Sequence, residues 1–527
     1  MSTPLPLGDT AHQRRQARPA PPSTARLLTD GGDARIVIEP GAGTNQYGCP
    51  PQPDPALTGL GSSTASVISE AGFAAAEQLR ARLLGTEGTV PAGVAYAREL
   101  NRIRRELKAL CGVTDLAGLE VVFGASGTDL HLIAAQLAAA STDRPTLAIM
   151  MDAEETGRGV AAALAGHHFS TRAALGAHVN EGTLIAGGYP LEVANVPIRL
   201  ANGAPRQPGD IDAEVECLVT NAVNRGWRVL LVLIDVSKTG AVAPSPGYVA
   251  SLHRRLAGSV DVLVDACQFR IAAPTLRAYL EQEFMVALTG SKFLTGPCFS
   301  GALLVPPSQA RRLSKRPLPR ALRPFCAAAD WPLRWITTRA LDKAANYGLL
   351  LRWEAALQEL RAFRAVPEAQ VKSFLQAFAG AVQRRLTDDP AFEPLTVPLP
   401  DRRPLSGSDS WDQVPTIFPF ALHRARSQGG RTLLSPEETA LVHRLLQLDL
   451  RGTDGSPAAP TDADTAAARF HLGQPVTCGH RQGMALRALR LCASTRLIVE
   501  ATREDGRHAP AVIERALTAL DKAALLV

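Results

Sequence analysis

A single lysine, Lys292, stands in the otherwise almost uncharged stretch VALTGSKFLTGPCFSGALLV at 286–305. Only seven of the 56 Lys and Arg residues of the chain are lysines, so an arginine would be the expected cation at this place. Burial lowers the pKa of a lysine, because the ammonium form loses its hydration. The neutral amine then forms a Schiff base with a carbonyl compound, which an always-protonated arginine cannot do. The position therefore favours covalent amine chemistry at Lys292.

A carboxylate ends a second apolar stretch, since Asp265 follows VDVLV and Gln268 comes three residues later. A buried carboxylate is costly unless a positive group lies opposite it. Two interpretations stay open on the residues alone: Asp265 carries chemistry, or it is a helix cap or a buried ion pair of the fold.

The run GASGTD at 124–129 follows the apolar run LEVVF and opens a helical segment. Backbone amides at a helix N-terminus, together with the hydroxyls of Ser126 and Thr128, are suited to hold a phosphate. The signal is weak by itself, because glycine-rich strand-to-helix turns are common. Its spacing also matches neither the Walker lysine motif nor GxGxxG.

Short apolar runs alternate with helical segments through the middle of the chain, as in LEVVF, TLAIMM, RVLLVLI, VDVLV and MVALT. Continuously apolar strands that alternate with helices predict a parallel sheet covered on both faces, and hence an α/β fold. Ligands of such a sheet bind at the carboxyl ends of its strands, where Asp265, Lys292 and residues 124–129 are all placed.

Three parts are expected along the chain. Residues 1–40 are predicted to be a flexible N-terminal arm, residues 41–325 the N-terminal segment and a large domain, and residues 326–527 a linker helix and a smaller C-terminal α/β domain.

Local signals add detail to the C-terminal part. Residues 331–363 are predicted to form one long helix. Ser435, with proline next and Glu438 three residues on, predicts a capping box at a helix start. The stretches 398–413 and 452–464, rich in Pro, Gly and Asp, are predicted to be surface loops.

The combined motifs resemble a known family. Asp-Ala-Cys-Gln at 265–268, Thr-Gly-Ser-Lys at 289–292 and GPCFSGAL at 296–303, preceded by GASGTD, are similar to fold-type I pyridoxal phosphate (PLP) enzymes. The nearest branch is that of class V aminotransferases and cysteine desulfurases. The resemblance covers about residues 115–310 well and the C-terminal domain loosely. It implies an aspartate-aminotransferase-like fold, PLP as cofactor, and a homodimer with active sites at its interface.

The resemblance also implies roles for single residues. Lys292 would carry the cofactor and move protons, Asp265 would pair with the pyridine nitrogen, and Gln268 would hydrogen-bond the phenolic oxygen. The expected phosphate-binding residues are Ser126, Gly127, Thr128, Thr289 and Ser291.

Some positions depart from the family pattern. Ser237, beside Lys238, stands where the family has an asparagine near the phenolic oxygen, and Glu155 stands where a histidine or aromatic residue usually stacks on the ring. Both are retained as cofactor-binding candidates. Residues 157–192 are longer than the family needs, and either a substrate lid or a surface loop is compatible with them.

Two residues of the C-terminal domain are further candidates. Arg490, in ALRALRLCAS, matches the family's arginine for the substrate carboxylate, although an ordinary ion pair is the alternative. Cys478 lies loosely where some desulfurases carry a nucleophilic cysteine, and a structural cysteine is the competing interpretation.

The function implied by the resemblance is a PLP-dependent transferase or lyase. It would act on an amino acid or its derivative through an external aldimine and a carbanion or quinonoid, with amino transfer as the default. The alternative is a lyase or β/γ-substitution enzyme of specialised biosynthesis, which makes or breaks C–S, C–N or C–C bonds and includes desulfurase-like chemistry. A non-enzymatic regulator is expected to lack Lys292 or Asp265 or to carry an added DNA-binding domain, and the sequence has neither feature.

The amino-acid composition argues against several other classes of protein. A net charge of +6 with scattered arginines and 5% aromatic residues does not predict a nucleic-acid-binding face. Eight cysteines without a CxxC pair or metal spacing predict no metal site and agree with a reducing cytoplasm. No apolar run has the length to span a bilayer, and the N-terminus has no secretory signal. A cytoplasmic protein is expected.

Overall fold

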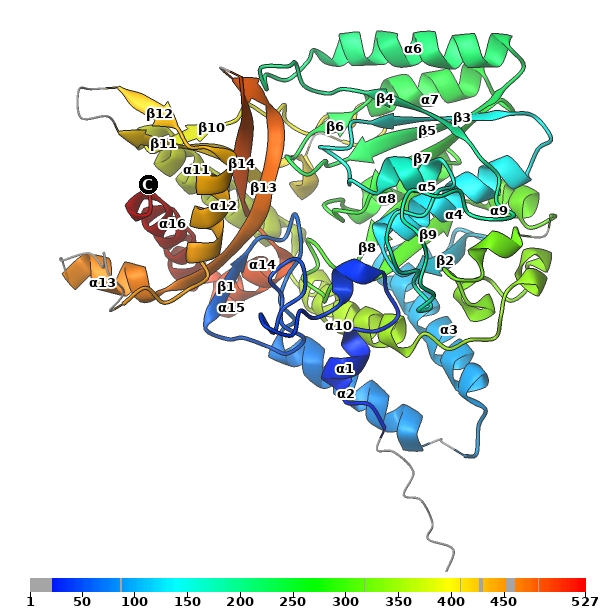
Figure 1. The fold of residues 1–527 in the computed structure, drawn as a ribbon, viewed down its shortest axis with the longest axis horizontal. Helices are drawn as coiled ribbons and strands as arrows, with labels where there is room; N and C mark the ends of the chain where they lie inside the picture. Colours follow the sequence, from blue (N-terminus) through cyan, green and yellow to red (C-terminus); the bar gives the residue numbers. More distant parts are fainter. Residues whose placement is uncertain are drawn as a thin grey trace, which may run out of the picture.

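The computed structural model describes residues 21–85, 88–316, 318–407, 409–425, 430–451, 460–481 and 483–527. Two sheets with helices packed around them lie side by side, and the N-terminal segment runs near their junction (Figure 1). Residues 1–20 of the predicted arm and 452–459 of a predicted loop lie outside the described residues.

The larger sheet has eight strands in the order β2-β9-β8-β7-β5-β3-β4, with β6 paired to β5. Its strands are β2 (Glu120–Gly124), β3 (Thr146–Met151), β4 (Glu192–Val196), β5 (Arg228–Asp235), β6 (Val242–Ala243), β7 (Val260–Ala266), β8 (Met285–Thr289) and β9 (Gly301–Val305). The neighbours from β4 to β8 are parallel, whereas β9 runs antiparallel between β8 and β2. The predicted α/β fold with a mainly parallel sheet is confirmed.

Helices cover both faces of this sheet, because successive side chains of each strand enter two separate cores. Leu231 of β5 belongs to one core, whereas its neighbours Leu230 and Val232 belong to the other. The covering helices are α3 (Ala92–Leu110), α4 (Gly127–Ala140), α5 (Val160–Leu164), α6 (Pro208–Asn224), α7 (Pro246–Arg255), α8 (Ala273–Glu281) and α9 (Pro307–Leu313). In Figure 1, α6 and α7 lie at the top of the view beside β4 and β5, and α4 and α5 lie lower, between the labels of β7 and β9.

A second, six-stranded sheet forms the smaller domain, in the order β1-β13-β14-β11-β10 with β12 paired to β11. Its strands are β1 (Leu57–Leu60), β10 (Phe392–Pro394), β11 (Ile417–Ala425), β12 (Arg431–Leu433), β13 (Arg469–Arg481) and β14 (Met484–Cys492). Its helices are α11 (Glu368–Asp388), α12 (Pro436–Leu445), α13 (Pro460–Ala467), α14 (Thr495–Ala501), α15 (Arg503–Gly506) and α16 (Ala509–Leu525). A smaller C-terminal domain with this composition was predicted.

The edge strand of the second sheet comes from the N-terminal segment. β1 pairs in parallel with β13, so residues 57–60 belong to the second sheet, whereas the boundary predicted at residue 325 groups them with the first. The capping box is confirmed, because the Ser435 hydroxyl accepts from the Glu438 amide and the Glu438 carboxylate accepts from the Ser435 amide.

Two local predictions are wrong for part of their length. The long helix predicted over 331–363 begins only at Tyr347, as α10 (Tyr347–Arg364), because the Asn346 side chain caps it by accepting from the Leu349 amide. The stretch 398–413 is not simply a surface loop, since Arg402 within it is fully buried. The buried carboxylate of Asp235 draws this guanidinium into the core.

The described half of the predicted arm is packed rather than free. It contains α1 (Thr24–Leu28) and the 3-10 helix η1 (Ala34–Ile36), followed after β1 by α2 (Glu70–Gly85). Arg352 of α10 donates to the carbonyls of residues 28, 30 and 31, which holds the segment against the helix. Gly348 makes this close approach possible, because a Cβ there would lie 2.1 Å from the Asp30 carbonyl oxygen.

Candidate active site

Three chain segments meet where β7 and β8 end. The first residue of α4, Gly127, packs against the turns that follow both strands. A Cβ at this position would lie 2.9 Å from Cys267 Sγ and 3.5 Å from Thr289 Cγ2. The structure thus brings together the helix start at 126–128, the turn after Asp265 and the turn before Lys292, as their strand-end positions predicted.

Asp265 is buried and has a histidine as its charged neighbour. His131 Nε2 lies 3.3 Å from Asp265 Oδ2, and the Cys267 amide donates to Asp265 Oδ1 at 3.1 Å. Burial by itself would raise the pKa of the carboxyl, but the positive charges of His131 and Lys292 hold it below its ordinary value. Asp265 is therefore ionised.

His131 was not identified from the sequence. It lies on the first turn of α4, where its Nδ1 contacts the Gly127 carbonyl oxygen at 2.8 Å and its Nε2 faces Asp265. Burial lowers the pKa of the imidazole, yet Asp265 outweighs this effect and raises it. The local signal was a histidine four residues after Gly127, in a helix that is mainly apolar beyond its first turn.

The sequence predicted Lys292 as the residue with a reactive amine. Among the described residues, no hydrogen bond or ion pair engages its Nζ, although the side chain lies among buried neighbours. Burial lowers its pKa, and the charges of Arg490 and Arg270 lower it further, against the opposing effect of Cys267 and Asp265. A free amine with a lowered pKa is a nucleophile.

The start of α4 has the groups expected of an anion cradle. Ser126 is the N-cap, and its hydroxyl accepts from the Asp129 amide and donates to Asp129 Oδ2 at 2.5 Å. The amides of Gly127 and Thr128, which begin the helix, have no acceptor within it. Thr289 lies beside this helix start and donates its hydroxyl to the Cys267 carbonyl at 2.5 Å, and Ser291 is buried two residues further on.

The small domain reaches the site through residues 61–66, a segment to which the sequence assigned no role. Gln268 Nε2 donates to the Ser63 carbonyl at 3.1 Å, and Arg490 Nη2 donates to Thr64 Oγ1 at 2.7 Å. Arg490 also donates to the carbonyls of Gln474 and Lys238, while its buried Nε has no partner. Burial lowers the pKa of this guanidinium.

Glu155 and Ser237 form a separate polar network. The Ser237 hydroxyl donates to Glu155 Oε2 at 2.7 Å, and Arg199 Nε donates to Oε1 at 2.7 Å. Thr239 Oγ1 donates to the same carboxylate. These contacts occupy the carboxylate and hold the turn 236–240 in place. A direct contact of Glu155 or Ser237 with a cofactor stays a prediction.

Lys238, on the same turn, is a second lysine near the site. Its Nζ donates to the Ala153 carbonyl at 3.3 Å. Burial, Arg490 and Lys292 together lower the pKa of Lys238 to about 8. It therefore shares the electrostatic field of Lys292 but, unlike Lys292, has a hydrogen-bond acceptor.

Cys478 and the stretch 157–192 both pack against other parts of the fold. Cys478 lies inside β13, and burial raises the pKa of its thiol to about 12, so it is a poor nucleophile. Residues 157–192 contain α5 and pack on the segment around Phe325, with Phe169 and His168 against that ring. Ser170 accepts from the Ala34 amide, which links the stretch to the N-terminal segment.

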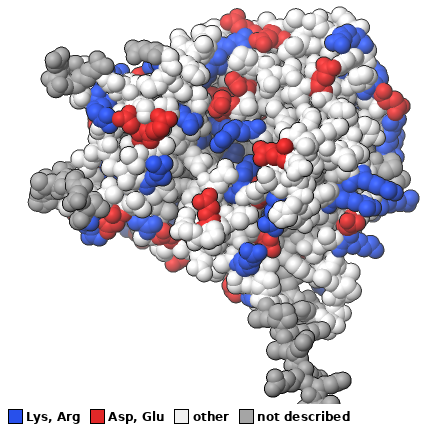
Figure 2. All heavy atoms as spheres, viewed as in Figure 1, with Lys and Arg blue, Asp and Glu red and all other residues white. Residues whose placement is uncertain are grey.

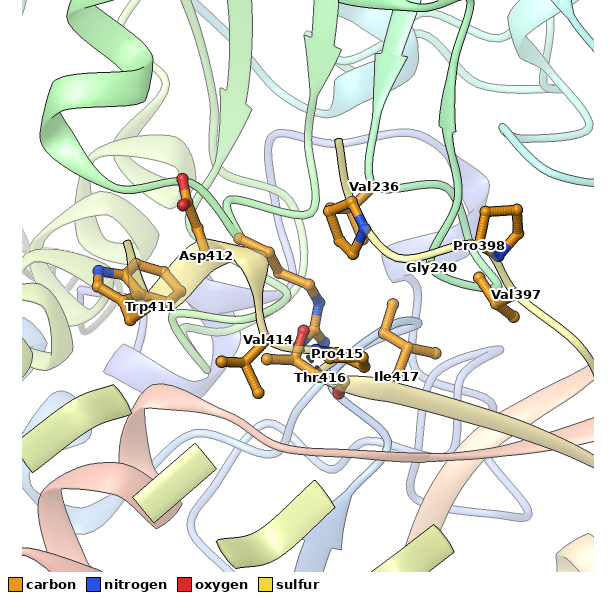
Figure 3. Close-up of a pocket in the computed structure, with 12 residues that line it drawn as sticks. Val236, Gly240, Val397, Pro398, Trp411, Asp412, Val414, Pro415, Thr416 and Ile417 are labelled. Atoms are coloured by element: carbon orange, nitrogen blue, oxygen red, sulfur yellow. Dashed lines mark hydrogen bonds between the residues drawn. The ribbon is translucent and has the colours of Figure 1, made fainter. Parts of the chain in front are cut away.

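A pocket between the two domains lies beside this site without containing its reactive groups. Most of its lining residues are apolar (Figure 3); they are Val236, Gly240, Arg270, Val397, Pro398, Pro400, Trp411, Asp412, Val414, Pro415, Thr416 and Ile417. Figure 2 shows Lys and Arg side chains gathered in the hollow between the domains on one face. An anionic ligand would be favoured there.

The side chains at the strand ends fit PLP. The free Lys292 amine suits an aldehyde, the ionised Asp265 suits a protonated ring nitrogen, and the start of α4 with its hydroxyls suits a phosphate. Each of the three matches a different part of one compact molecule, and the packing of Gly127 holds them together.

No family model and no curated protein sequence matches the chain. Among solved structures, the chain is similar to the cysteine desulfurase CsdA of Escherichia coli, with 16% identity and a TM-score of 0.48, over 89% of this chain and 94% of that chain. It is similar to the cystine C-S lyase C-DES in complex with cysteine persulfide, with 15% identity and a TM-score of 0.48, over 86% and 97%. A third is the Oryza sativa TDC with PLP and tryptamine, with 14% identity and a TM-score of 0.47, over 89% and 84%.

None of the described helices is long and apolar enough to cross a membrane.

Proposed function

We propose that the chain is a PLP-dependent enzyme, a transferase or lyase that acts on an amino acid or an amino-acid derivative. The observation that carries this proposal is the free, low-pKa amine of Lys292 opposite an ionised Asp265 at the carboxyl ends of neighbouring strands. A lysine in an ordinary buried ion pair would have a hydrogen-bonded carboxylate, and among the described residues Lys292 has none.

When bound, PLP supplies an electron sink for bonds at the substrate's α-carbon. In this proposal Lys292 would hold the cofactor aldehyde, and its amine would move the substrate proton. Asp265 would pair with the protonated ring nitrogen, while His131 positions Asp265. Ser126, Gly127, Thr128, Thr289 and Ser291 would bind the phosphate, and Gln268 would hydrogen-bond the phenolic oxygen.

The test of the cofactor site is covalent capture. Protein reconstituted with PLP should show a visible absorption band that borohydride abolishes, and the added mass should appear on the peptide with Lys292. The matched variants are Lys292→Ala, expected to lose the band, and Lys238→Ala, expected to keep it. Capture at Lys238 instead would contradict the assignment.

Arg490 is proposed to bind the substrate carboxylate, supported by its position between residues 61–66 and the turn of Lys238 and by its unpartnered Nε. Arg490→Lys keeps the charge but loses the planar fork. It should therefore weaken substrate binding more than PLP binding, as measured by spectral titration of each. Unchanged substrate affinity would place the carboxylate partner elsewhere.

Amino transfer is the default reaction, and a lyase or β/γ-substitution reaction, including desulfurase-like chemistry, is the second candidate. The departures at Glu155 and Ser237, joined in one network with Arg199, favour the second. The raised thiol pKa of Cys478 speaks against that cysteine as a desulfurase nucleophile. An aminotransferase bleaches its absorption band with substrate until a keto acid is added, whereas a lyase turns over without one.

The homodimer that the family resemblance implies is also a proposal. Light scattering of the purified protein tests it, and a mass of one chain at micromolar concentration would contradict it. A cytoplasmic location stays a prediction from the sequence.

A further inference from the structure

The N-terminal segment places a guanidinium in the anion cradle. Arg35, on η1, has its Nη2 3.4 Å from Ser126 Oγ and 3.3 Å from Thr128 Oγ1, the two hydroxyls at the start of α4. We propose that Arg35 is a ligand of the cofactor phosphate, so that the N-terminal segment completes the cofactor site. This inference rests on the proposed PLP function.

Arg35 has hydrogen-bond donors to spare for an anion. Asp33 accepts from Nε at 3.0 Å and from Nη2 at 2.5 Å. A guanidinium has five N–H groups; Asp33, Ser126 and Thr128 engage only Nε and Nη2 of Arg35, and the Tyr47 hydroxyl is a further neighbour of the guanidinium. Arg35 can therefore keep its pair with Asp33 and still bind a phosphate oxygen, the geometry for which arginine is suited.

The carboxyl groups near the start of α4 would disfavour a phosphate there unless a cation lay beside it. Asp129, whose Oδ1 is buried without a partner, lies at the helix start beside the two hydroxyls. Burial, and then the charge of Asp33, raise the pKa of Asp129 to about 7, while Arg35 counteracts the rise. A phosphate placed here without Arg35 would meet two carboxyl groups and only uncharged donors.

Contacts from three other segments fix Arg35 in place. Its guanidinium carbon lies 4.9 Å from the centre of the Phe299 ring, in the loop that follows Lys292. The neighbouring Ala34 amide donates to Ser170 Oγ at 3.2 Å, and Arg172 pairs with Asp30 at 3.1 Å. Arg352 joins the segment to the same loop, because it donates to the carbonyls of Phe299 and Gly31. The guanidinium is thus preorganised, and little entropy is lost when an anion binds.

Equilibrium binding of PLP and of pyridoxal, which lacks the phosphate, tests the proposal by absorption titration. Arg35→Gln should raise the Kd of PLP about 10- to 100-fold, the range expected for a lost hydrogen bond to a charged group. The Kd of pyridoxal should stay within about twofold, because Arg35 contacts only the phosphate end. Arg26→Gln, on the exposed side of α1, is the matched control and should leave both constants unchanged.

Asp33→Asn separates a ligand from a purely structural arginine. If Arg35 binds phosphate, this variant should bind PLP at least as tightly as the wild type, because Arg35 loses a competing anion. If Arg35 only anchors the segment through Asp33, both Asp33→Asn and Arg35→Gln should weaken PLP and pyridoxal equally, which would overturn the proposal. Arg35→Lys, expected to give an intermediate Kd for PLP, replaces Arg35→Gln if the latter does not fold.

The outcomes also separate this inference from the proposed function. A wild-type protein that binds neither PLP nor pyridoxal overturns the proposed function and this inference with it. A wild-type preference for PLP over pyridoxal that Arg35→Gln retains leaves the cofactor in place and overturns the role of Arg35.

Discussion

Two aspartates near the ends of neighbouring parallel strands have opposite kinds of partner. Asp235 ends β5, and Asp265 lies at the end of β7, in register with Ile234. Arg402 binds both oxygens of Asp235, at 2.7 and 2.6 Å, and Tyr279 donates to it at 2.7 Å. Asp265 instead faces His131 at 3.3 Å and the field of Lys292, whose pKa is lowered.

The comparison separates a carboxylate with a permanently charged partner from one whose partners can change their protonation. An arginine is always charged, so the Asp235 pair is complete and has no state to change. Histidine and lysine can gain or lose a proton, so the surroundings of Asp265 can respond to a ligand. Asp265 also lies in a buried pair, with His131, but its partner can lose its proton, whereas the partner of Asp235 cannot.

The largest effect is expected at Asp235. Asp235→Asn removes the closer counter-charge of the fully buried Arg402 and leaves only Asp412, at 4.0 Å; breaking such a pair costs about 3–5 kcal/mol of unfolding free energy. Urea denaturation measures this. Adding Arg402→Met should recover part of the loss, because it removes the buried positive charge that Asp235→Asn leaves undercompensated. A loss below about 1 kcal/mol would show that the pair contributes little.

Asp265→Asn should have the opposite balance of effects. It should lower the free energy of unfolding less than Asp235→Asn does, and lower the catalytic rate strongly. The ring nitrogen loses its counter-charge, so turnover should fall at least about 10²-fold while PLP remains bound. Steady-state kinetics and the visible absorption band measure the two effects. Near-normal turnover would make Asp265 structural and remove the contrast.

His131→Gln sharpens the comparison through pH. The folded-state pKa of His131 is raised above 6.5, so its stabilisation is fully present below 6.5 and is lost as pH rises through the folded value. Asp265 has a lowered pKa, so the stabilisation that depends on its negative charge is lost only at acid pH. The stability advantage of the cofactor-free wild type over His131→Gln should therefore shrink above neutral pH, by about 1 kcal/mol. A constant difference from pH 6 to 9 in urea denaturation would argue against the ion pair.

The smallest expected effect is a difference in reactivity between two buried thiols whose surroundings shift their pKa in opposite directions. A hydrogen bond from Cys49, with help from Asn45 and Arg352, lowers the pKa of the buried Cys298, whereas burial raises that of Cys478 to about 12. Thiolates are the reactive form, so iodoacetamide should label Cys298 several-fold faster than Cys478 in the folded protein. Peptide mass spectrometry gives the order, and equal rates would show that access rather than pKa controls labelling.

Much of the candidate site was predictable because its residues follow strand ends. Apolar runs predicted β7 and β8, and a polar residue after such a run has to lie at the edge of the sheet where ligands bind. Asp265, Lys292 and the start of α4 were found in this way, and the structure brings them together.

The residues that were missed act across long stretches of chain. Arg35, His131, residues 61–66 and Arg402 carry no local pattern that distinguishes them from ordinary arginines, helix positions or loops. Arg402 was placed in a surface loop because prolines and aspartates surround it, and only its partner in β5 explains its burial.

The amino-acid sequence by itself determined the elements and the strand-end positions of the reactive residues, because strand periodicity, caps and turns depend on near neighbours along the chain. It also placed a lysine, and not an arginine, at position 292. The tertiary structure alone decided which charge faces which carboxylate. Asp235 and Asp265 follow similar apolar runs, but their carboxylates have different partners, Arg402 and His131. Only the packing of distant segments brings these partners near. Burial then sets the pKa of each group, and burial is a property of the whole fold.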